Sequence, residues 1–161
     1  MSDILISDEL KEALLDQWVE EKTNSSIYIS IGAWFKNKGF DNLGKFFMDA
    51  SLEEDGHAKQ IVDIMTDLNI DFMVKEIPSF EGVMDCTAVA GIFLSREEQT
   101  TDSLNELKKL SMEENPIIEE FSRKMISQQQ AEMEEALSFF DKVQIVGNDY
   151  KMLLLWDLSL K

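Results

Sequence analysis

Apolar side chains recur at alternating spacings of three and four residues along four long stretches of the chain, which is the pattern of helices that bury one face in a bundle. The stretches predicted to be helical are about residues 8–36, 41–68, 84–113 and 117–145. The segments "NKGFDN" and "EENPIIEE" contain turn residues that separate neighbouring helices. After the turn "GNDY", the apolar "KMLLLWDLSLK" predicts a short fifth helix at about 149–160.

The segment between the second and third helices, "NIDFMVKEIPSFEGV", has no helical period and contains Pro78. A helix of about 28 residues is about 42 Å long, and an extended segment of about 15 residues reaches equally far. We therefore expect the second and third helices to run parallel, joined by a crossover along the bundle. The predicted fold is all-α: one domain, 1–161, with a crossover four-helix bundle (about 8–145) and a short terminal helix.

Each predicted buried face is apolar at both ends and polar near its middle. The polar side chains at mid-height are Glu21 on the first helix, Glu54 and His57 on the second, Glu97 on the third, and Gln129 and Glu132 on the fourth. No Lys or Arg occupies a buried-face position near them. Four buried carboxylates without a counter-charge cannot all stay ionised, so the cluster either takes up protons or holds a multivalent cation.

One Glu on a buried helix face is usually an edge residue whose charge reaches solvent, and one core His is usually just hydrogen-bonded. Polar ligand types at the same height on all four helices are harder to assign to chance, so the pattern favours a cation. Carboxylate, amide and imidazole ligands suit iron or manganese rather than copper or a closed zinc site. The spacing of Glu54 and His57 lets both reach one ion, as in di-iron carboxylate bundles.

The composition adds limits on partners and compartment. The 32 acidic and 15 basic residues give a net charge of −17, which argues against nucleic-acid binding. A single cysteine, Cys86, excludes an internal disulfide and a cysteine-based zinc site. The start "MSDILISDEL" lacks a signal-peptide pattern, and no apolar run reaches membrane-spanning length. We expect a cytoplasmic protein with no membrane partner.

Nearly the whole chain resembles the ferritins, specifically the non-haem prokaryotic type. The segments that carry the resemblance are "LLDQWVEEKTNSSIYISIGAWF", "LEEDGHA", "EEQTTDSLNELKKL" and "DKVQIVGNDYKMLLLWDLSL". The last is similar to the turn and short fifth helix of ferritins. The resemblance implies an iron-storage ferroxidase that oxidises Fe(II) with oxygen or hydrogen peroxide and stores ferric mineral in a 24-subunit shell. The apolar fifth helix independently predicts self-association.

The resemblance also implies a role for each polar residue at mid-height, with two iron ions per subunit. The implied ligands are Glu21, Glu54 and His57 for the first ion, and Glu54, Glu97 and Glu132 for the second. Gln129 matches a glutamine beside the ferroxidase centre. Tyr28 matches a nearby tyrosine, for which electron supply and simple core filling are both open readings.

Two departures from related families limit the cofactors. Bacterioferritins repeat Glu-x-x-His on the fourth helix, where this chain has Gln129 and Glu132. They also carry a haem-ligating Met at the position of Asp55, so we expect no haem.

A third iron site is doubtful for a related reason. Prokaryotic ferritins that hold a third ion use a Glu at the position of Glu53 and two more on the fourth helix, where this chain has Gln128 and Ala131. Glu53 is therefore either a solvated acid or a transient ligand. Glu119 and Glu120 match residues that line pores in ferritin shells, although acids at a helix start are common.

Two rival functions remain open from sequence alone. A non-storing di-iron peroxidase or oxygenase of the same superfamily would use the same ligands. A metal-free acidic interaction module would leave the buried carboxylates unexplained.

Overall fold

The computed structural model describes residues 6–82 and 85–160. All regular secondary structure in these ranges is helical, as predicted. The helices are α1 (Asp8–Asn37), α2 (Asp41–Asp67), α3 (Cys86–Ser111), α4 (Pro116–Val146) and α5 (Tyr150–Ser159). Their ends lie within two residues of the predicted ends. Residue 84, where the pattern placed the start of the third helix, lies outside the described residues.

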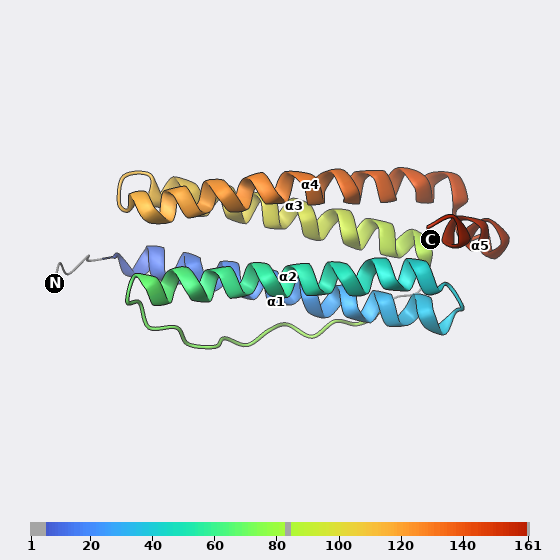
Figure 1. Ribbon diagram of the computed structural model, residues 1–161, viewed down its shortest axis with the longest axis horizontal. Helices are drawn as coiled ribbons and strands as arrows, with labels where there is room; N and C mark the ends of the chain where they lie inside the picture. Colours follow the sequence, from blue (N-terminus) through green and yellow to red (C-terminus); the bar gives the residue numbers. More distant parts are fainter. Residues whose placement is uncertain (1–5, 83–84, 161) are drawn as a thin grey trace.

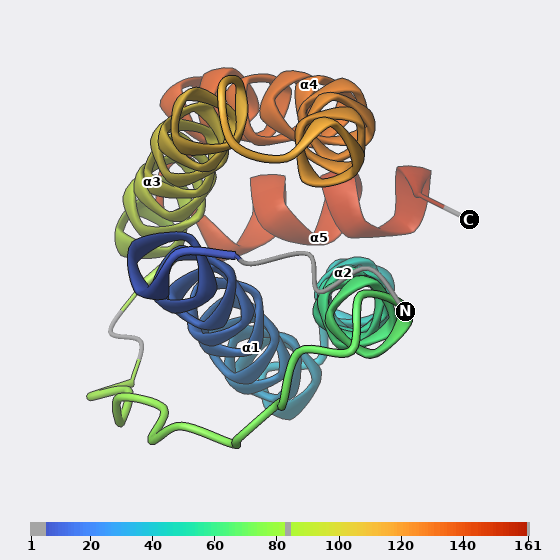
Figure 2. The same ribbon diagram turned by 90° about the vertical axis from the view of Figure 1, so that its left-hand side faces the viewer.

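The four long helices form a bundle in which α1 is antiparallel to α2 and α3 is antiparallel to α4 (Figure 1). An extended segment after α2 runs back along the side of the bundle before α3 begins, so α2 and α3 run parallel. The view along the bundle shows α5 lying across one end (Figure 2). The predicted all-α bundle with one long crossover and a short fifth helix is confirmed.

Most helix starts are capped by the side chain that precedes them, as the local sequence favours. Ser7 accepts a hydrogen bond from Leu10 N at the start of α1, and Asn115 accepts from two backbone amides at the start of α4. The residue before α2, Phe40, makes no such bond. Asp157 of α5 instead accepts from Leu43 N at 2.7 Å, so the terminal helix caps α2 and is fixed to it.

The apolar core is divided into two clusters, one toward each end of the bundle. The cluster nearer α5 is rich in aromatic rings and includes Phe35, Phe47, Phe93 and Phe139. The cluster at the opposite end is mostly aliphatic and includes Leu14, Ile61, Leu104 and Ile118. The mid-height polar residues lie between these clusters, which shield them from solvent along the bundle axis.

The two glycines at the α1–α2 contact explain how these helices approach closely. A Cβ added at Gly32 would lie 2.9 Å from the carbonyl oxygen of Gly44, and a Cβ at Gly44 would lie equally close to that of Gly32. Neither position therefore has room for a side chain without a shift of the backbone. This close packing sets the spacing of the helix pair that carries Glu21 and Glu54.

Burial along α2 departs from the predicted face. The spacing of three and four residues that contains Glu54 and His57 also predicts that Ala50 and Ile64 are buried. In the structure these two residues are only half-buried, whereas Ser51, Ala58 and Met65 are buried. A straight helix has 3.6 residues per turn, so a face predicted with a 3.5-residue period drifts by about 20° every seven residues. His57, on the same predicted face, keeps 12% of its side chain exposed.

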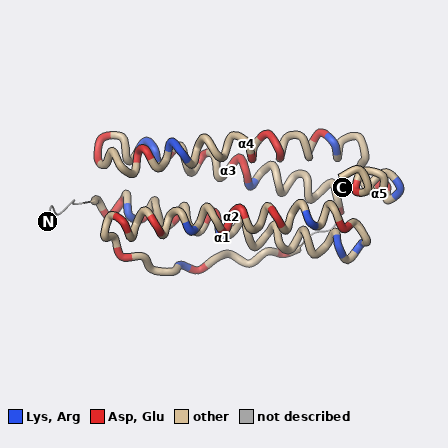
Figure 3. The backbone as a smooth tube through the Cα atoms, in the orientation of Figure 1, with Lys and Arg blue, Asp and Glu red and all other residues tan. Residues whose placement is uncertain are grey.

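Acidic residues are distributed along all four long helices and the crossover (Figure 3). Within the described ranges, none of the helices is both long enough and apolar enough to cross a bilayer.

Candidate metal centre

Five side chains from all four long helices meet at mid-height and form two overlapping groups of possible metal ligands. The first group is Glu21, Glu54 and His57, and the second is Glu54, Glu97 and Glu132. Within each group, one ligand atom from every residue lies within 4.8 Å of the others. Glu54 belongs to both groups, so its carboxylate lies where it can bridge two ions.

His57 lies between the two groups. Its Nδ1 is 3.5 Å from Glu21 Oε2 and 3.6 Å from Glu54 Oε2, while its Nε2 is 3.4 Å from Glu132 Oε1. Nδ1 is therefore the nitrogen that faces the first group. The side chain faces inward because it lies three residues after Glu54, on the same side of α2.

Three buried carboxylate oxygens have no hydrogen-bond donor. They are Glu21 Oε2, Glu54 Oε2 and Glu132 Oε2, and they are the only such side-chain atoms found across residues 6–82 and 85–160. Each belongs to a residue that is at most 9% exposed. A buried, unpaired carboxylate oxygen is costly, so these atoms require either a proton shared between neighbours or a cation.

Glu97 differs because protein donors hold both of its oxygens. The Tyr28 hydroxyl donates to Oε1 at 2.5 Å, and Gln129 Nε2 donates to Oε2 at 2.6 Å. Tyr28 is fully buried between the rings of Phe47 and Phe93. The sequence-predicted neighbours of the centre, Tyr28 and Gln129, thus lie directly against a possible ligand of the second group.

Burial and mutual repulsion shift the pKa values of the carboxylates. Burial raises the pKa of Glu54 well above its usual range, and the adjacent Glu21 carboxyl group and the charges of Glu132 and Glu97 raise it further. Burial also raises the pKa of Glu132 to about 8, despite the opposing charge of His57. The pKa of Glu97 is raised by burial, and its bonds from Tyr28 and Gln129 partly offset that rise.

Glu21 and His57 shift in the opposite sense, toward their charged forms. Burial raises the pKa of Glu21, but the neighbouring Glu54 carboxyl group, the adjacent His57 and the hydrogen bond from Gln17 outweigh it, and the net shift is downward. Burial lowers the pKa of His57, but the adjacent Glu21 and the other nearby carboxylate charges bring it to about 8. Without a cation, these surroundings therefore favour the protonated forms of Glu54, Glu132 and His57.

The remaining acidic residues singled out in the sequence lie outside both groups. Glu53 is exposed, although its charge raises the pKa of His57, Glu132 and Glu135. Gln128 and Ala131 are also exposed.

The acids at the predicted pore, Glu119 and Glu120, and Asp55 at the family's haem position also lie outside the two ligand groups. Near the start of α4, Glu119 accepts a hydrogen bond from Arg123 at 2.8 Å, and Glu120 is exposed. Asp55 is paired with Lys22 at 2.8 Å.

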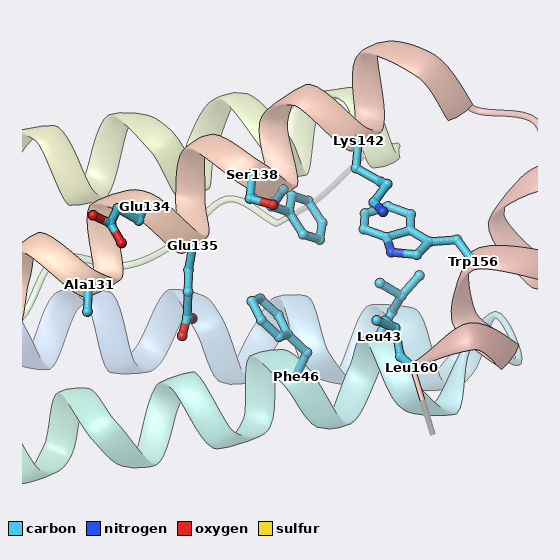
Figure 4. Close-up of a pocket in the computed structure, with 10 residues that line it drawn as sticks. Leu43, Phe46, Ala131, Glu134, Glu135, Ser138, Lys142, Trp156 and Leu160 are labelled. Atoms are coloured by element: carbon cyan, nitrogen blue, oxygen red, sulfur yellow. The ribbon is translucent and has the colours of Figure 1, made fainter.

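A cavity of about 560 Å³ lies between α2, α4 and α5, away from the ligand groups (Figure 4). Phe46 and Trp156 line it together with the exposed acids Glu134 and Glu135. None of the residues of the two groups lines this cavity. The cavity is therefore separate from the mid-height centre.

One buried residue that contacts a possible ligand was missed in the sequence. Gln17 is fully buried, and its Nε2 donates to Glu21 Oε1 at 3.0 Å. The available signal was its position four residues before Glu21, which places the two side chains on one face of the helix. Amide side chains at such positions are common, so the spacing alone does not distinguish a functional residue.

A crossover four-helix bundle with carboxylates and a histidine projecting inward is the architecture of the ferritin-like helical bundles. The family model for ferritin, described as a ferritin-like domain, matches residues 11–146. The chain therefore belongs to the ferritin family.

Curated relatives span almost the same length as this chain. A probable bacterial non-haem ferritin-like protein of Haemophilus influenzae is 25% identical, over 97% of this chain and 96% of that protein. A bacterial non-haem ferritin of Campylobacter jejuni is 24% identical, over 98% and 95%. Among solved structures, an open-pore ferritin of the archaeon Archaeoglobus fulgidus superposes with a TM-score of 0.89 at 23% identity, covering 96% of each chain. This last likeness is one of fold.

Proposed function

We propose that the protein is an iron-storage ferritin that oxidises Fe(II) at a two-ion centre within each subunit. The observation that carries the proposal is the set of three buried carboxylate oxygens without donors, on Glu21, Glu54 and Glu132. They lie in two groups that share Glu54, so two ions can be held side by side. The names of the relatives, non-haem ferritins, agree with this proposal.

The charges and donor types suit Fe(II) as the substrate. Four carboxylates carry four negative charges, which two Fe(II) ions balance once the shared protons leave. The oxygen and imidazole donors are those that iron accepts. In the proposal, Glu21, Glu54 and Nδ1 of His57 bind the first ion, and Glu54, Glu97 and Glu132 bind the second. No haem is expected, because Asp55 stands at the family's haem position.

Oxidation changes this balance. Two Fe(II) ions lose one electron each, and O₂ takes up these two electrons and two protons to give H₂O₂. With peroxide as oxidant, the same two electrons and two protons give two waters. Two Fe(III) ions then carry two more positive charges than the four carboxylates, so hydroxide or oxide ligands formed from water must accompany them as they move toward the mineral. In the proposal, Tyr28 supplies an electron to the second ion through Glu97, to which its hydroxyl donates a hydrogen bond.

Storage requires assembly, and the fifth helix has the surface for it. Four apolar residues on α5 and one directly after it are 42% to 65% exposed, namely Met152, Leu154, Leu155, Leu158 and Leu160. Such a surface on one short helix is typical of a subunit contact. We propose a cytoplasmic shell of 24 copies of the 18.5 kDa chain, about 440 kDa in total.

Three measurements on the wild-type protein test the proposal together. Anaerobic titration should find two Fe(II) ions bound per subunit, oxygen uptake should follow their addition, and native mass measurement should give the 24-subunit particle. Rapid oxidation by a small oligomer that forms no mineral would favour the non-storing di-iron peroxidase or oxygenase. Absence of tight Fe(II) binding would refute both.

A further inference from the structure

The contact between α1 and α3 is unusually polar at the height of the centre. The two helices lie side by side and antiparallel (Figures 1 and 2). Gln17 and Asn24 of α1 and Thr100 of α3 are all fully buried there. These positions flank Glu21 on α1 and follow Glu97 on α3, where apolar side chains would otherwise be expected. Buried polar groups persist only where hydrogen bonds satisfy them.

One of these residues touches a proposed ligand directly. Gln17 Nε2 donates to Glu21 Oε1 at 3.0 Å, while Glu21 Oε2 has no donor and belongs to the first ligand group. The bond therefore treats the two carboxylate oxygens differently. One is held by the protein, and the other is left for the cation. Glu21 cannot rotate Oε1 into the site without losing its buried hydrogen bond from Gln17.

Ser103 of α3 fixes the orientation of the Gln17 amide. Its hydroxyl donates to Gln17 Oε1, so the amide oxygen faces α3 and the amide nitrogen faces Glu21. If the amide were reversed, its oxygen would oppose the carboxylate oxygen of Glu21. The serine thus links α3 to the ligand through one intervening side chain.

A second bridge, one turn away on the other side of Glu21, holds the helices together without touching a ligand. Arg96 donates to Glu20 at 2.6 Å and to Asn24 at 2.7 Å, and Asn24 donates to Thr100 at 2.8 Å. Because this second bridge joins α1 to α3, the Gln17–Ser103 pair is not the only polar contact that holds the two helices together. The difference makes the two bridges separable by mutation.

We propose that Gln17, oriented by Ser103, is a positioning residue that presents a single oxygen of Glu21 to the first Fe(II) ion. The inference rests on the proposed function, because it assigns a role within the same two-ion centre. Residues that hold metal ligands from behind commonly change metal affinity by 10- to 100-fold when removed. The expected effect falls on the first ion, because Glu21 is absent from the second group.

The test uses Gln17→Met, which keeps an unbranched side chain but removes the amide. The half-saturating Fe(II) concentration for initial oxidation should rise about tenfold or more, while the maximal rate at saturating Fe(II) stays close to wild type. Crystals of the variant soaked anaerobically in limiting Fe(II) should show lower iron occupancy than wild type at the first position. Ser103→Ala should give a smaller rise, and Ser103→Thr, which keeps the hydroxyl, should restore wild-type behaviour.

Thr23→Val is the matched control for removal of a buried polar group from α1. The Thr23 hydroxyl bonds to the Val19 carbonyl oxygen within the same helix, so its loss should leave the half-saturating concentration unchanged. If the wild-type protein binds two Fe(II) ions and Gln17→Met has the same half-saturating Fe(II) concentration as wild type, the positioning role is overturned but the proposed function is not. No anaerobic Fe(II) binding by the wild-type protein would overturn the proposed function and this inference together.

Discussion

Replacing Glu132 by Gln should stabilise the protein when no cation is present. In the folded chain the pKa of Glu132 is raised from 4.5 to about 8, chiefly by burial. At pH 7 the folded protein must therefore take up a proton that the unfolded chain does not hold, which costs about 3 kcal/mol. A glutamine of nearly the same shape removes this cost, so Glu132→Gln should raise the free energy of unfolding by an amount of that order.

The sign of the pH dependence follows from the same shift. Because the folded pKa lies above the unfolded value, the stabilising contribution of Glu132 is complete below pH 4.5 and is lost as the pH rises toward 8. His57 acts in the same direction, since its folded pKa of about 8 also exceeds its usual 6.5. Wild-type protein freed of metal should thus be markedly less stable at pH 8 than at pH 5, and Glu132→Gln should show a shallower decline.

Thermal or denaturant unfolding at pH 5 and pH 8, with a chelator present, measures both effects. Glu134→Gln is the control, because Glu134 is an exposed acid on the same helix. Adding Co(II), a divalent ion that oxygen does not oxidise under these conditions, should stabilise the wild-type protein most at pH 8, where fewer protons compete for the carboxylates. The reasoning fails if metal-free Glu132→Gln is less stable than wild type, or if its decline between pH 5 and pH 8 is as steep.

Four further predictions follow from the contacts of the centre and the fold. His57→Ala should weaken binding of the first ion and stop rapid paired oxidation. Glu132→Ala should leave one tightly held ion, and Glu54→Ala should lose both ions. Iron occupancies in anaerobically soaked crystals would show each result, and two full iron peaks in Glu132→Ala would refute the assignment of α4. Native mass measurement should give about 440 kDa from 24 chains of 18.5 kDa. A stable dimer at micromolar concentration would contradict this prediction. The purified protein should lack a Soret band, because Asp55 stands at the family's haem position. A stoichiometric haem spectrum would contradict this prediction. Gly32→Ala should destabilise the fold by about 1–3 kcal/mol in denaturant unfolding, since its Cβ would meet the Gly44 carbonyl oxygen at 2.9 Å, and an unchanged midpoint would argue against that tight contact.

The bounds of the helices and the height of the polar layer follow from local sequence patterns. Periodic burial and turn residues are local properties, so they placed each helix end within two residues of its position in the structure. The predicted buried faces of α1, α3 and α4 are buried throughout, including Glu21, Glu97 and Glu132. Residue spacing alone brought these acids to one level, because all four helices share the same rise per residue. The assignment of iron to them stays a prediction.

The contacts between these side chains depend on how the helices pack in three dimensions. Which carboxylate oxygen lacks a donor depends on partners from other helices, such as Tyr28 against Glu97 and Ser103 behind Gln17. The bond from Leu43 to Asp157 joins residues 114 positions apart, and no local pattern announces it. The 12% exposure of the His57 side chain likewise reflects the 3.6-residue turn of α2 as it packs in the bundle. Periodicity fixes the face on which a residue lies, whereas hydrogen-bond geometry is set by the distances between helices once they have packed.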